Sequence, residues 1–281
     1  MSIMRKLREY LNRPLSFVMF LLIIISTVIT ALTVVFIIGY IFIKGVPNLS
    51  LDLFSLKYSS SNQSMLPSII NTVYLTALTL LLAVPIGIFS AIYLAEYSRK
   101  NSFFVKIINI ANETLSGIPS IVYGLFGFLA FVISKKWGYS LLAGVITLAI
   151  MVLPLIIRTS QEAMLGVDNT FREASYGLGA GKLRTVFKIV LPSAMPGILS
   201  GIILAIGRIV GETAALIYTA GTVPEAATKL TSSSRTISVH LYCLLNEGLY
   251  TEQAYATAVV LIVFVAVSYT HLRAHETGRN L

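Results

Sequence analysis

Residues 195–220 read MPGILSGIILAIGRIVGETAALIYTA, an apolar stretch with two charges near its middle. A helix needs roughly 20 apolar residues to cross a bilayer core of about 30 Å, so this stretch predicts a membrane-spanning helix. Arg208 and Glu212 are four residues apart and are therefore expected one turn apart on it. Because a charge at the centre of a membrane helix costs about 2.5 to 3.5 kcal/mol, we expect the pair to face a bundle interior or a water-filled path.

The rest of the chain has the composition of an integral membrane protein. Its 281 residues are 56% hydrophobic and only 12% charged, and the mean hydropathy is +0.83. Soluble domains, in contrast, carry about 25% charged residues. The predicted fold class is therefore all-α and integral to the membrane. Six transmembrane helices are expected, near residues 17–43, 68–95, 104–133, 139–158, 189–220 and 253–269.

The distribution of Lys and Arg predicts the orientation of these helices. With both termini inside, fourteen of the 21 basic residues lie in cytoplasmic segments, six lie outside, and Arg208 lies within the membrane. This bias follows the positive-inside rule, so we expect N-in and C-in. The net charge of +9 then reflects topology beside anionic lipid and requires no nucleic acid partner. The predicted organisation is a cytoplasmic N-terminus (1–16) and a membrane domain (17–267) with a cytoplasmic loop at 158–188.

Glycine and proline interrupt the third stretch at Gly117-Ile-Pro119. Membrane helices tolerate such residues where neighbouring helices or water satisfy the freed backbone groups, so we expect a kink or a discontinuous helix there. Glu113 precedes this segment, and a carboxylate at the start of a membrane helix is most often interfacial. Cys243 is the only cysteine, which excludes an intrachain disulfide.

The predicted cytoplasmic loop before the fifth helix is about thirty residues long, more than a compact helical protein usually needs. Thr170-Phe-Arg-Glu173 has the form of a capping box, in which the Thr170 hydroxyl accepts a hydrogen bond from the Glu173 amide. We expect a short helix to start there and to end in a turn at Gly177, Gly179 and Gly181. A helix lying on the membrane surface is the alternative interpretation.

The spacing of particular residues within this loop indicates its function more specifically than the periodicity of its apolar residues does. Glu173-Ala-Ser, Gly179 and Ile189-Val-Leu-Pro192 resemble the Glu-Ala-Ala loop of bacterial ABC importer permeases, with serine in place of the second alanine. The resemblance implies a type I importer permease core of the MetI-like kind. It also implies that the short helix is a coupling helix, which sits in a groove of a cytoplasmic ATPase, and that Glu173, Ala174 and Gly179 belong to that contact.

Two further segments narrow the resemblance. Gly207-Arg-Ile-Val-Gly-Glu-Thr-Ala214 and Leu115-Ser-Gly-Ile-Pro-Ser-Ile-Val-Tyr-Gly-Leu-Phe126 are similar to segments of the phosphate-specific permeases. That similarity implies a multi-pass subunit of the bacterial plasma membrane that transports inorganic phosphate, with no cofactor and no catalytic residue of its own. It also implies a PstC-like second permease, a PstB-like ATPase dimer and a PstS-like phosphate-binding protein as partners.

The chemistry of the intramembrane charges agrees with a phosphate substrate. Arg208 offers a planar, permanently charged fork to an oxyanion. Glu212 is able to accept a hydrogen bond from protonated phosphate and repels sulfate, which lacks that proton. Thr213 is a weaker candidate because a membrane threonine usually bonds its own helix backbone. The alternative is a purely structural pair, since residues four apart on a helix are able to meet.

Other functions stay open at this point. The coupling loop alone also permits an importer of sulfate, molybdate or an organic solute. A membrane enzyme that uses Glu113 or Glu212 as acid or base is a hypothesis from a different class. The two differ in what they require, because an importer needs a path for its substrate, whereas an enzyme needs a cluster of reactive side chains.

Two apparent motifs do not predict ligand sites. Gly177 to Lys182 departs from a Walker loop because three residues, not four, separate its outer glycines and leucine follows the lysine, so ATP hydrolysis is expected of a separate subunit. His271 and His275 have the spacing of metal ligands, but zinc is not expected there. They lie in residues 268–281, which resemble translated vector sequence and are expected to be a non-native tail.

Overall fold

The computed structural model describes residues 14–98 and 102–277, and the secondary structure within these ranges is helical, without a β-strand. Residues 1–13 of the expected N-terminal segment and residues 278–281 of the expected tail lie outside the described ranges. The elements are α2 (Pro14–Gly45), η1 (Val46–Asn48), η2 (Leu51–Phe54), α3 (Leu66–Ile92), the π-helix η3 (Tyr93–Tyr97), α4 (Phe103–Ser116), α5 (Ser120–Gly127), the π-helix η4 (Phe128–Ser134), α6 (Leu141–Leu165), α7 (Asn169–Gly177), α8 (Lys182–Thr185), the π-helix η5 (Val186–Val190), α9 (Leu191–Gly211), α10 (Ala214–Thr219), α11 (Ile237–Glu247) and α12 (Thr251–Thr277).

Five of the described helical segments are long and apolar enough to cross a membrane, and a bent pair makes a sixth if its two halves count as one span. This confirms the all-α membrane fold. The third predicted span is not one straight helix, because the axes of Val105–Ser116 and Ser120–Ser134 differ by 101°. Pro119 explains the break, since it lacks an amide hydrogen and disfavours helical geometry at the residue before it.

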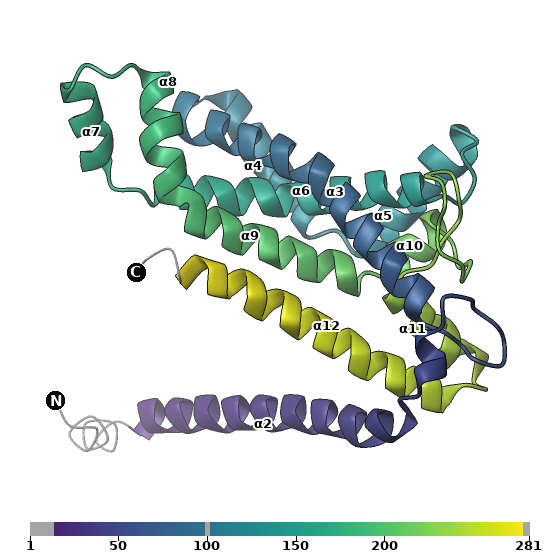
Figure 1. Ribbon diagram of the computed structural model, residues 1–281. Coiled ribbons are helices and arrows are strands. Elements are labelled where there is room, and N and C mark those ends of the chain that lie inside the picture. Colours follow the sequence, from purple (N-terminus) through teal and green to yellow (C-terminus); the bar gives the residue numbers. More distant parts are fainter. Residues whose placement is uncertain (1–13, 99–101, 278–281) are drawn as a thin grey trace.

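The described ends of the chain lie at the same end of the helix bundle (Figure 1). α2 begins and α12 ends there, on the side where α7 and α8 project beyond the long helices. The opposite end carries α11 and the segments that join α2 to α3 and α10 to α11. With the bent pair counted as one span, six crossings return the chain to the side on which it began, as the N-in, C-in orientation requires.

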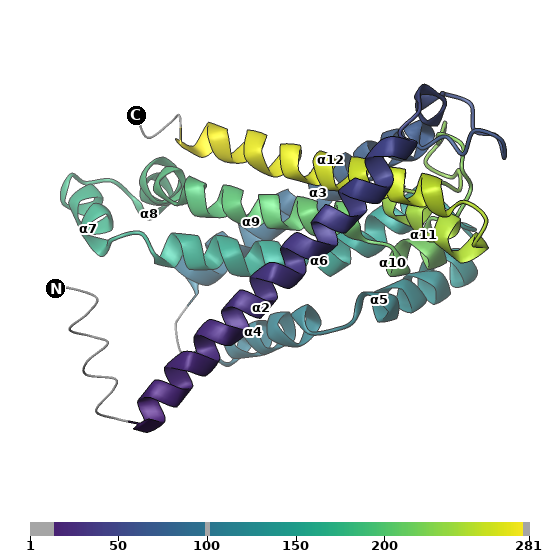
Figure 2. The same cartoon turned by 90° about the horizontal axis from the view of Figure 1, so that it is seen from below.

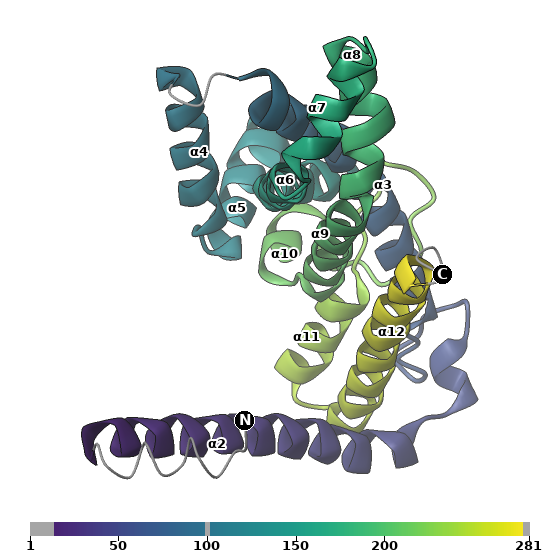
Figure 3. The ribbon, with the colours of Figure 1, turned by 90° about the vertical axis from the view of Figure 1, so that its left-hand side faces the viewer.

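α2 lies apart from the other membrane helices, as Figures 1 and 3 show, and in the view of Figure 2 it runs obliquely across them. Its main contact within the chain is with α12. The two backbones touch at Gly45, where a Cβ would collide with the carbonyl oxygen of Tyr255. None of the apolar window of α2 is buried, and Phe36 is 70% exposed. This helix is therefore available to lipid or to another subunit.

α6 forms the centre of the bundle. It packs along α3 and α9 and also contacts α4, α5 and α10; Figure 3, in which α6 is seen nearly end-on, shows its neighbours around it. Leu148, Met151 and Ile156 of α6 are fully buried in the main apolar core. The helices approach closely because small residues lie at the crossings: a Cβ on Gly87 of α3 would come within 2.6 Å of the Ile156 side chain.

The stretch 195–220 is not one helix, which corrects the expectation from the sequence. α9 ends at Gly211, Glu212 has an extended backbone (φ −73°, ψ 130°), and α10 begins at Ala214. The break places α10 against α5, where a Cβ on Gly124 would lie 2.8 Å from the Cα of Ala215. Arg208 and Glu212 are therefore not one turn apart on a shared helix.

The boundaries of the cytoplasmic loop also differ from the prediction. α6 continues to Leu165, past the expected helix end at 158, and the helical segment that leads through η5 into α9 begins at Lys182. The capping box predicted for Thr170 is wrong, because α7 is capped by Asp168, whose Oδ1 accepts a hydrogen bond from the Thr170 amide at 2.9 Å. Aspartate is among the strongest N-cap residues. The predicted glycine turn is confirmed by Gly179, which has a φ of +81°.

Candidate functional site

An apolar groove lies between α7 and the segment formed by α8 and η5. Leu178 is 89% exposed and Phe171 is 56% exposed, although both are large hydrophobic residues. Ala174 and Gly179, two residues singled out from the sequence, both line this groove, while Glu173 is exposed on the same helix but does not line it. The volume is about 400 Å³, and the lining residues are Phe171, Ala174, Ser175, Leu178, Gly179, Ala180, Arg184 and Ile189. Clustered exposed apolar side chains of this kind mark a contact with another molecule.

Ser175 faces inward and ties α7 to α8. It is 9% exposed, and its Oγ lies 2.9 Å from the Oγ1 of Thr185, which is fully buried. Thr185 Oγ1 in turn donates to the carbonyl of Gly181 at 3.2 Å. The serine in place of the second alanine therefore has a structural partner, and the two short helices hold one another in place.

Arg172 connects α7 to the membrane helices, a role that was not predicted from the sequence. Its Nε and Nη2 donate to Oε1 of Glu96 at 3.1 and 2.7 Å. Nη2 also donates to the carbonyl of Met164 at 2.8 Å, and Nη1 donates to the carbonyl of Val167 at 2.7 Å and to Oδ1 of Asn169 at 3.3 Å. From the sequence, Arg172 was predictable only as a positively charged residue of the expected cytoplasmic loop. Its carboxylate partner, Glu96, lies 76 residues away along the chain.

Arg208 lies half-buried in the last turn of α9, close to two helix breaks. Its charge acts on the hydroxyl of Tyr123 in α5. That hydroxyl donates at 2.8 Å to the carbonyl of Leu115 in α4, across the bend at Pro119. The other break, at Glu212, follows Arg208 directly along the chain. Discontinuous membrane helices leave backbone groups and helix ends inside the bundle, which is the arrangement that substrate sites in transporters use.

Glu212 and Thr213 have local partners. Glu212 is 8% exposed, and its Oε1 accepts a hydrogen bond from the Ala215 amide at 3.1 Å, in the first turn of α10. Thr213 Oγ1 lies 3.4 Å from the carbonyl of Gly211. Within residues 14–98 and 102–277, the ion pairs are Arg172–Glu96 and Arg158–Glu162, so Arg208 and Glu212 do not form one. The half-buried guanidinium of Arg208 is thus not neutralised by that carboxylate.

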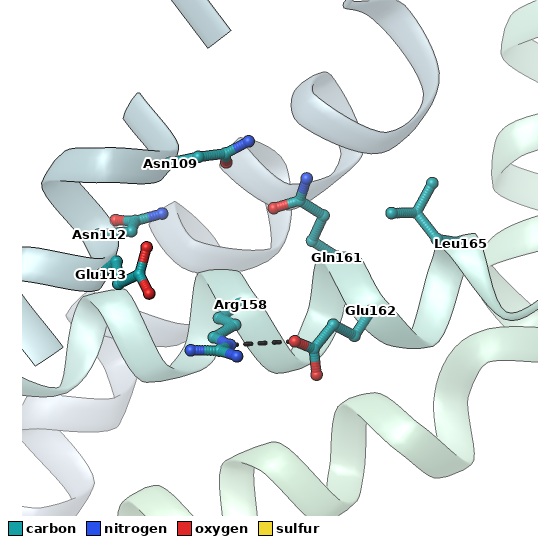
Figure 4. A pocket seen from close by; sticks show the side chains of 7 residues that line it. All are labelled: Asn109, Asn112, Glu113, Arg158, Gln161, Glu162 and Leu165. Atoms are coloured by element: carbon teal, nitrogen blue, oxygen red, sulfur yellow. Dashed lines mark hydrogen bonds and ion pairs between the residues drawn. The ribbon is translucent and has the colours of Figure 1, made fainter. Parts of the chain in front are cut away.

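A second polar site, shown in Figure 4, lies between α4 and the C-terminal part of α6. Arg158 donates to Glu162 at 3.0 Å, and the side chain of Glu113 from α4 turns toward the same space. The pocket has a volume of about 240 Å³ and is lined by Asn109, Asn112, Glu113, Arg158, Gln161, Glu162 and Leu165. Amide and guanidinium groups are donors to an anion, and the carboxylates are acceptors for a protonated one. The sequence pointed to Glu113 alone.

A buried polar cluster lies at the opposite end of the bundle. Arg235, predicted only as an outer charge, is 4% exposed, and its guanidinium lies 4.7 Å from the ring centroid of Tyr58. His240 of α11 is fully buried, with its ring edge-on to Tyr58 at 6.4 Å. Burial, and after it the charge of Arg235, lower the pKa of His240 to about 3. Asn71 of α3 joins the cluster by donating to the Arg235 carbonyl at 3.2 Å.

The fold defines a class of protein, the multi-pass helical membrane protein with a short helix, α7, between two of its spans. Its fold is that of ABC importer permeases. The chain matches a bacterial ABC transporter that imports the acidic polysaccharide alginate with a TM-score of 0.63 and 18% identity, over 96% of this chain and 99% of the other. It matches the MetNI methionine ABC transporter with a TM-score of 0.57 and 16% identity, over 75% and 92%.

The chain belongs to the family of binding-protein-dependent transport system inner membrane components, whose model matches residues 83–278. It is 32% identical to the probable ABC transporter permease protein YqgI of Bacillus subtilis, over 85% of this chain and 87% of that protein. It is 35% identical to the phosphate transport system permease protein PstA of Haemophilus influenzae, over 77% of each chain. A PstA of Yersinia pestis is also 35% identical, over 82% and 79%. The chain is therefore a multi-pass transport subunit of the plasma membrane and not an enzyme.

Proposed function

We propose that this chain is the permease subunit of an ATP-driven importer of inorganic phosphate. The observation that carries the proposal is its 35% identity to phosphate transport permeases named PstA, over about four-fifths of the chain. The half-buried, permanently charged Arg208 suits such a substrate, because a guanidinium donates two parallel hydrogen bonds to an oxyanion.

In this proposal Arg208 binds phosphate at the meeting point of the two broken helices. Glu212 stands at the second break, buried and engaged with the α10 amide of Ala215 through one oxygen. Its carboxylate accepts a hydrogen bond from protonated phosphate and repels sulfate, which distinguishes the two anions. Thr213 is a secondary donor at the same break. Because no direct bond ties Arg208 to Glu212, the guanidinium is available to the anion.

The groove between α7 and the segment formed by α8 and η5 is proposed as the ATPase contact. Ala174 and Gly179 line it and Glu173 stands beside it, in agreement with the resemblance of this loop to coupling loops. The partners are a PstC-like permease, a PstB-like ATPase dimer and a PstS-like phosphate-binding protein, with ATP hydrolysed by the ATPase. Residues 17–267 then form the permease domain, with 1–16 and the loop 158–188 in the cytoplasm and 268–281 a non-native tail.

The alternative function is an ATP-driven importer with the same subunits that transports another substrate. Two solved permeases that share this fold belong to transporters of methionine and alginate, so the fold does not select phosphate. Sulfate, molybdate and organic solutes therefore stay as competing substrates. Anion competition during uptake separates them, since only the true substrate and its close analogues reduce phosphate transport.

The test is phosphate uptake by the complete transporter in proteoliposomes. Arg208→Ala is expected to reduce kcat/KM for phosphate at least about a hundredfold. Arg208→Lys is expected to retain only part of the normal kcat/KM, because the lysine ammonium keeps the charge but does not donate the two parallel hydrogen bonds of a guanidinium. Glu212→Gln is expected to retain the cap bond to Ala215 yet to lose the preference for phosphate over sulfate. Normal uptake and normal anion preference in both Arg208→Ala and Glu212→Gln would contradict the proposed path.

A further inference from the structure

The guanidinium of Arg172 has no donor left free. Its five N–H groups are distributed over Glu96, Met164, Val167 and Asn169. Met164 belongs to the last turn of α6, and Glu96 belongs to η3 at the end of α3. Because every N–H group of the planar guanidinium is hydrogen-bonded, the side chain is held in one position. α7 is therefore held against two spanning helices at once.

Glu96 lies where the end of α3 widens into a π-helix. Its side chain is 7% exposed and that of Arg172 is 13% exposed, so the pair is shielded from solvent and salt. Single π-turns recur at functional sites in helices. η3 also contacts α6 and continues directly from α3. A movement of Glu96 is therefore transmitted to α3 through continuous helical structure, with no loop in between.

A second contact joins the same short segment to α8. The ammonium of Lys182 lies 4.9 Å from the ring centroid of Tyr97, the residue after Glu96. α8 is tied back to α7 by the buried pair Ser175 and Thr185. The two short helices and η3 thus form a closed ring of contacts. Beneath them, Met164 packs with Ile92 and Val186 in an apolar cluster.

We propose that Arg172 and Glu96 form the rigid link that passes movement of α7 to α3, so that α7 and η3 move as one body. The proposal rests on the proposed function, in which a partner ATPase moves α7. Through the carbonyl of Met164 the same arginine also engages α6. Arg172 is thus a positioning residue, which acts on the transport path through α3 and α6 and not by contact with substrate.

A distance measurement tests the link without any assumption about substrate. Spin labels at Tyr176→Cys of α7 and Tyr93→Cys of η3, both exposed positions, are introduced with Cys243→Ser into the complete transporter in nanodiscs. We expect one narrow distance that is the same with and without ATP. Arg172→Gln and Glu96→Gln should broaden it or make it depend on ATP. An unchanged narrow distance in both variants would overturn the proposal, and Glu96→Gln preserves side-chain size if Arg172→Gln fails to assemble.

Coupling is then measured as phosphate transported per ATP hydrolysed. Each single variant is expected to lower this ratio roughly five- to tenfold with an unchanged KM for phosphate. The double variant should be no worse than Arg172→Gln alone, because that substitution already removes the interaction with Glu96. Lys188→Gln and Glu252→Gln, which neutralise exposed charges, are matched controls expected to leave the ratio unchanged. A normal ratio in Arg172→Gln would reject the link. If the unaltered transporter moved no phosphate, the proposed function would fail, while the distances would still decide the link.

Discussion

Gly124 of α5 lies directly against Ala215 of α10, so that a Cβ on the glycine would come within 2.8 Å of the Ala215 Cα and 3.2 Å of the Ala214 carbonyl oxygen. Each of these helices begins just after a break in its span, one at Pro119 and the other at Glu212. The contact is made by backbone atoms, which have little room to move. It therefore holds together the two broken helices near Arg208.

Gly124→Ala is expected to destabilise the protein by about 1 to 3 kcal/mol, because the added methyl group is forced against backbone. Thermal unfolding of the protein in nanodiscs measures the effect, with a shift of about 2 to 4 °C expected per kcal/mol. Gly39→Ala is the matched control: it lies in α2 with nothing within 4 Å of its added Cβ, and it should be neutral or slightly stabilising. Equal melting temperatures for both variants would show that the contact between α5 and α10 is loose.

Gly179→Ala is expected to strain the turn after α7, since Gly179 has a φ of +81°. Nothing lies within 4 Å of an added Cβ there, so the cost of about 1 to 2 kcal/mol is conformational and not steric. We expect the strained turn to displace α7 and to lower the phosphate transported per ATP hydrolysed. Gly179→Asn should be milder, because asparagine tolerates left-handed geometry better than other residues.

Gly177→Ala is the control for this prediction. Gly177 is equally open, with nothing within 4 Å of an added Cβ, but it lies in the last turn of α7 and lacks a positive φ. It is expected to leave the transport ratio unchanged. A loss as large in Gly177→Ala as in Gly179→Ala would show that bulk on the exposed face matters, and not the geometry of the turn.

Acidification is expected to destabilise the buried polar cluster around Arg235 through His240. Its pKa in the folded protein is lowered to about 3, first by burial and then by the charge of Arg235. The unfolded chain therefore binds a proton near pH 6.5 that the folded chain does not bind, and stability is lost as the pH falls from about 6.5 toward 3. The slope from this residue is at most about 1.4 kcal/mol per pH unit.

Thermal unfolding between pH 7.5 and 5 measures that slope. His240→Phe removes the titrating group and keeps a ring beside Tyr58, so its melting temperature should fall less steeply with acid than that of the unaltered chain. Parallel curves for the two proteins would mean that His240 contributes nothing to the acid sensitivity.

The sequence alone determined the features that depend on local chemistry. Apolar length against the thickness of a bilayer predicted the spans, and the bias of Lys and Arg predicted their direction. The spacing from Glu173 to Pro192 pointed to a resemblance to coupling loops, and the turn predicted after the short helix is present, with Gly179 at a φ of +81°. Each of these signals lies within one segment, so no knowledge of neighbouring helices was needed to read it.

The tertiary structure decided which distant residues meet. The sequence suggested Arg208 and Glu212 as a pair on one helix, but that helix ends at Gly211, and α10, which follows the break at Glu212, packs against α5. It also gave no sign that Arg172 would pair with Glu96, 76 residues away. The physical reason is the same in both cases. Whether a charge finds a partner, and where a helix ends, depends on which surfaces are buried together, and periodicity along one chain segment does not contain that information.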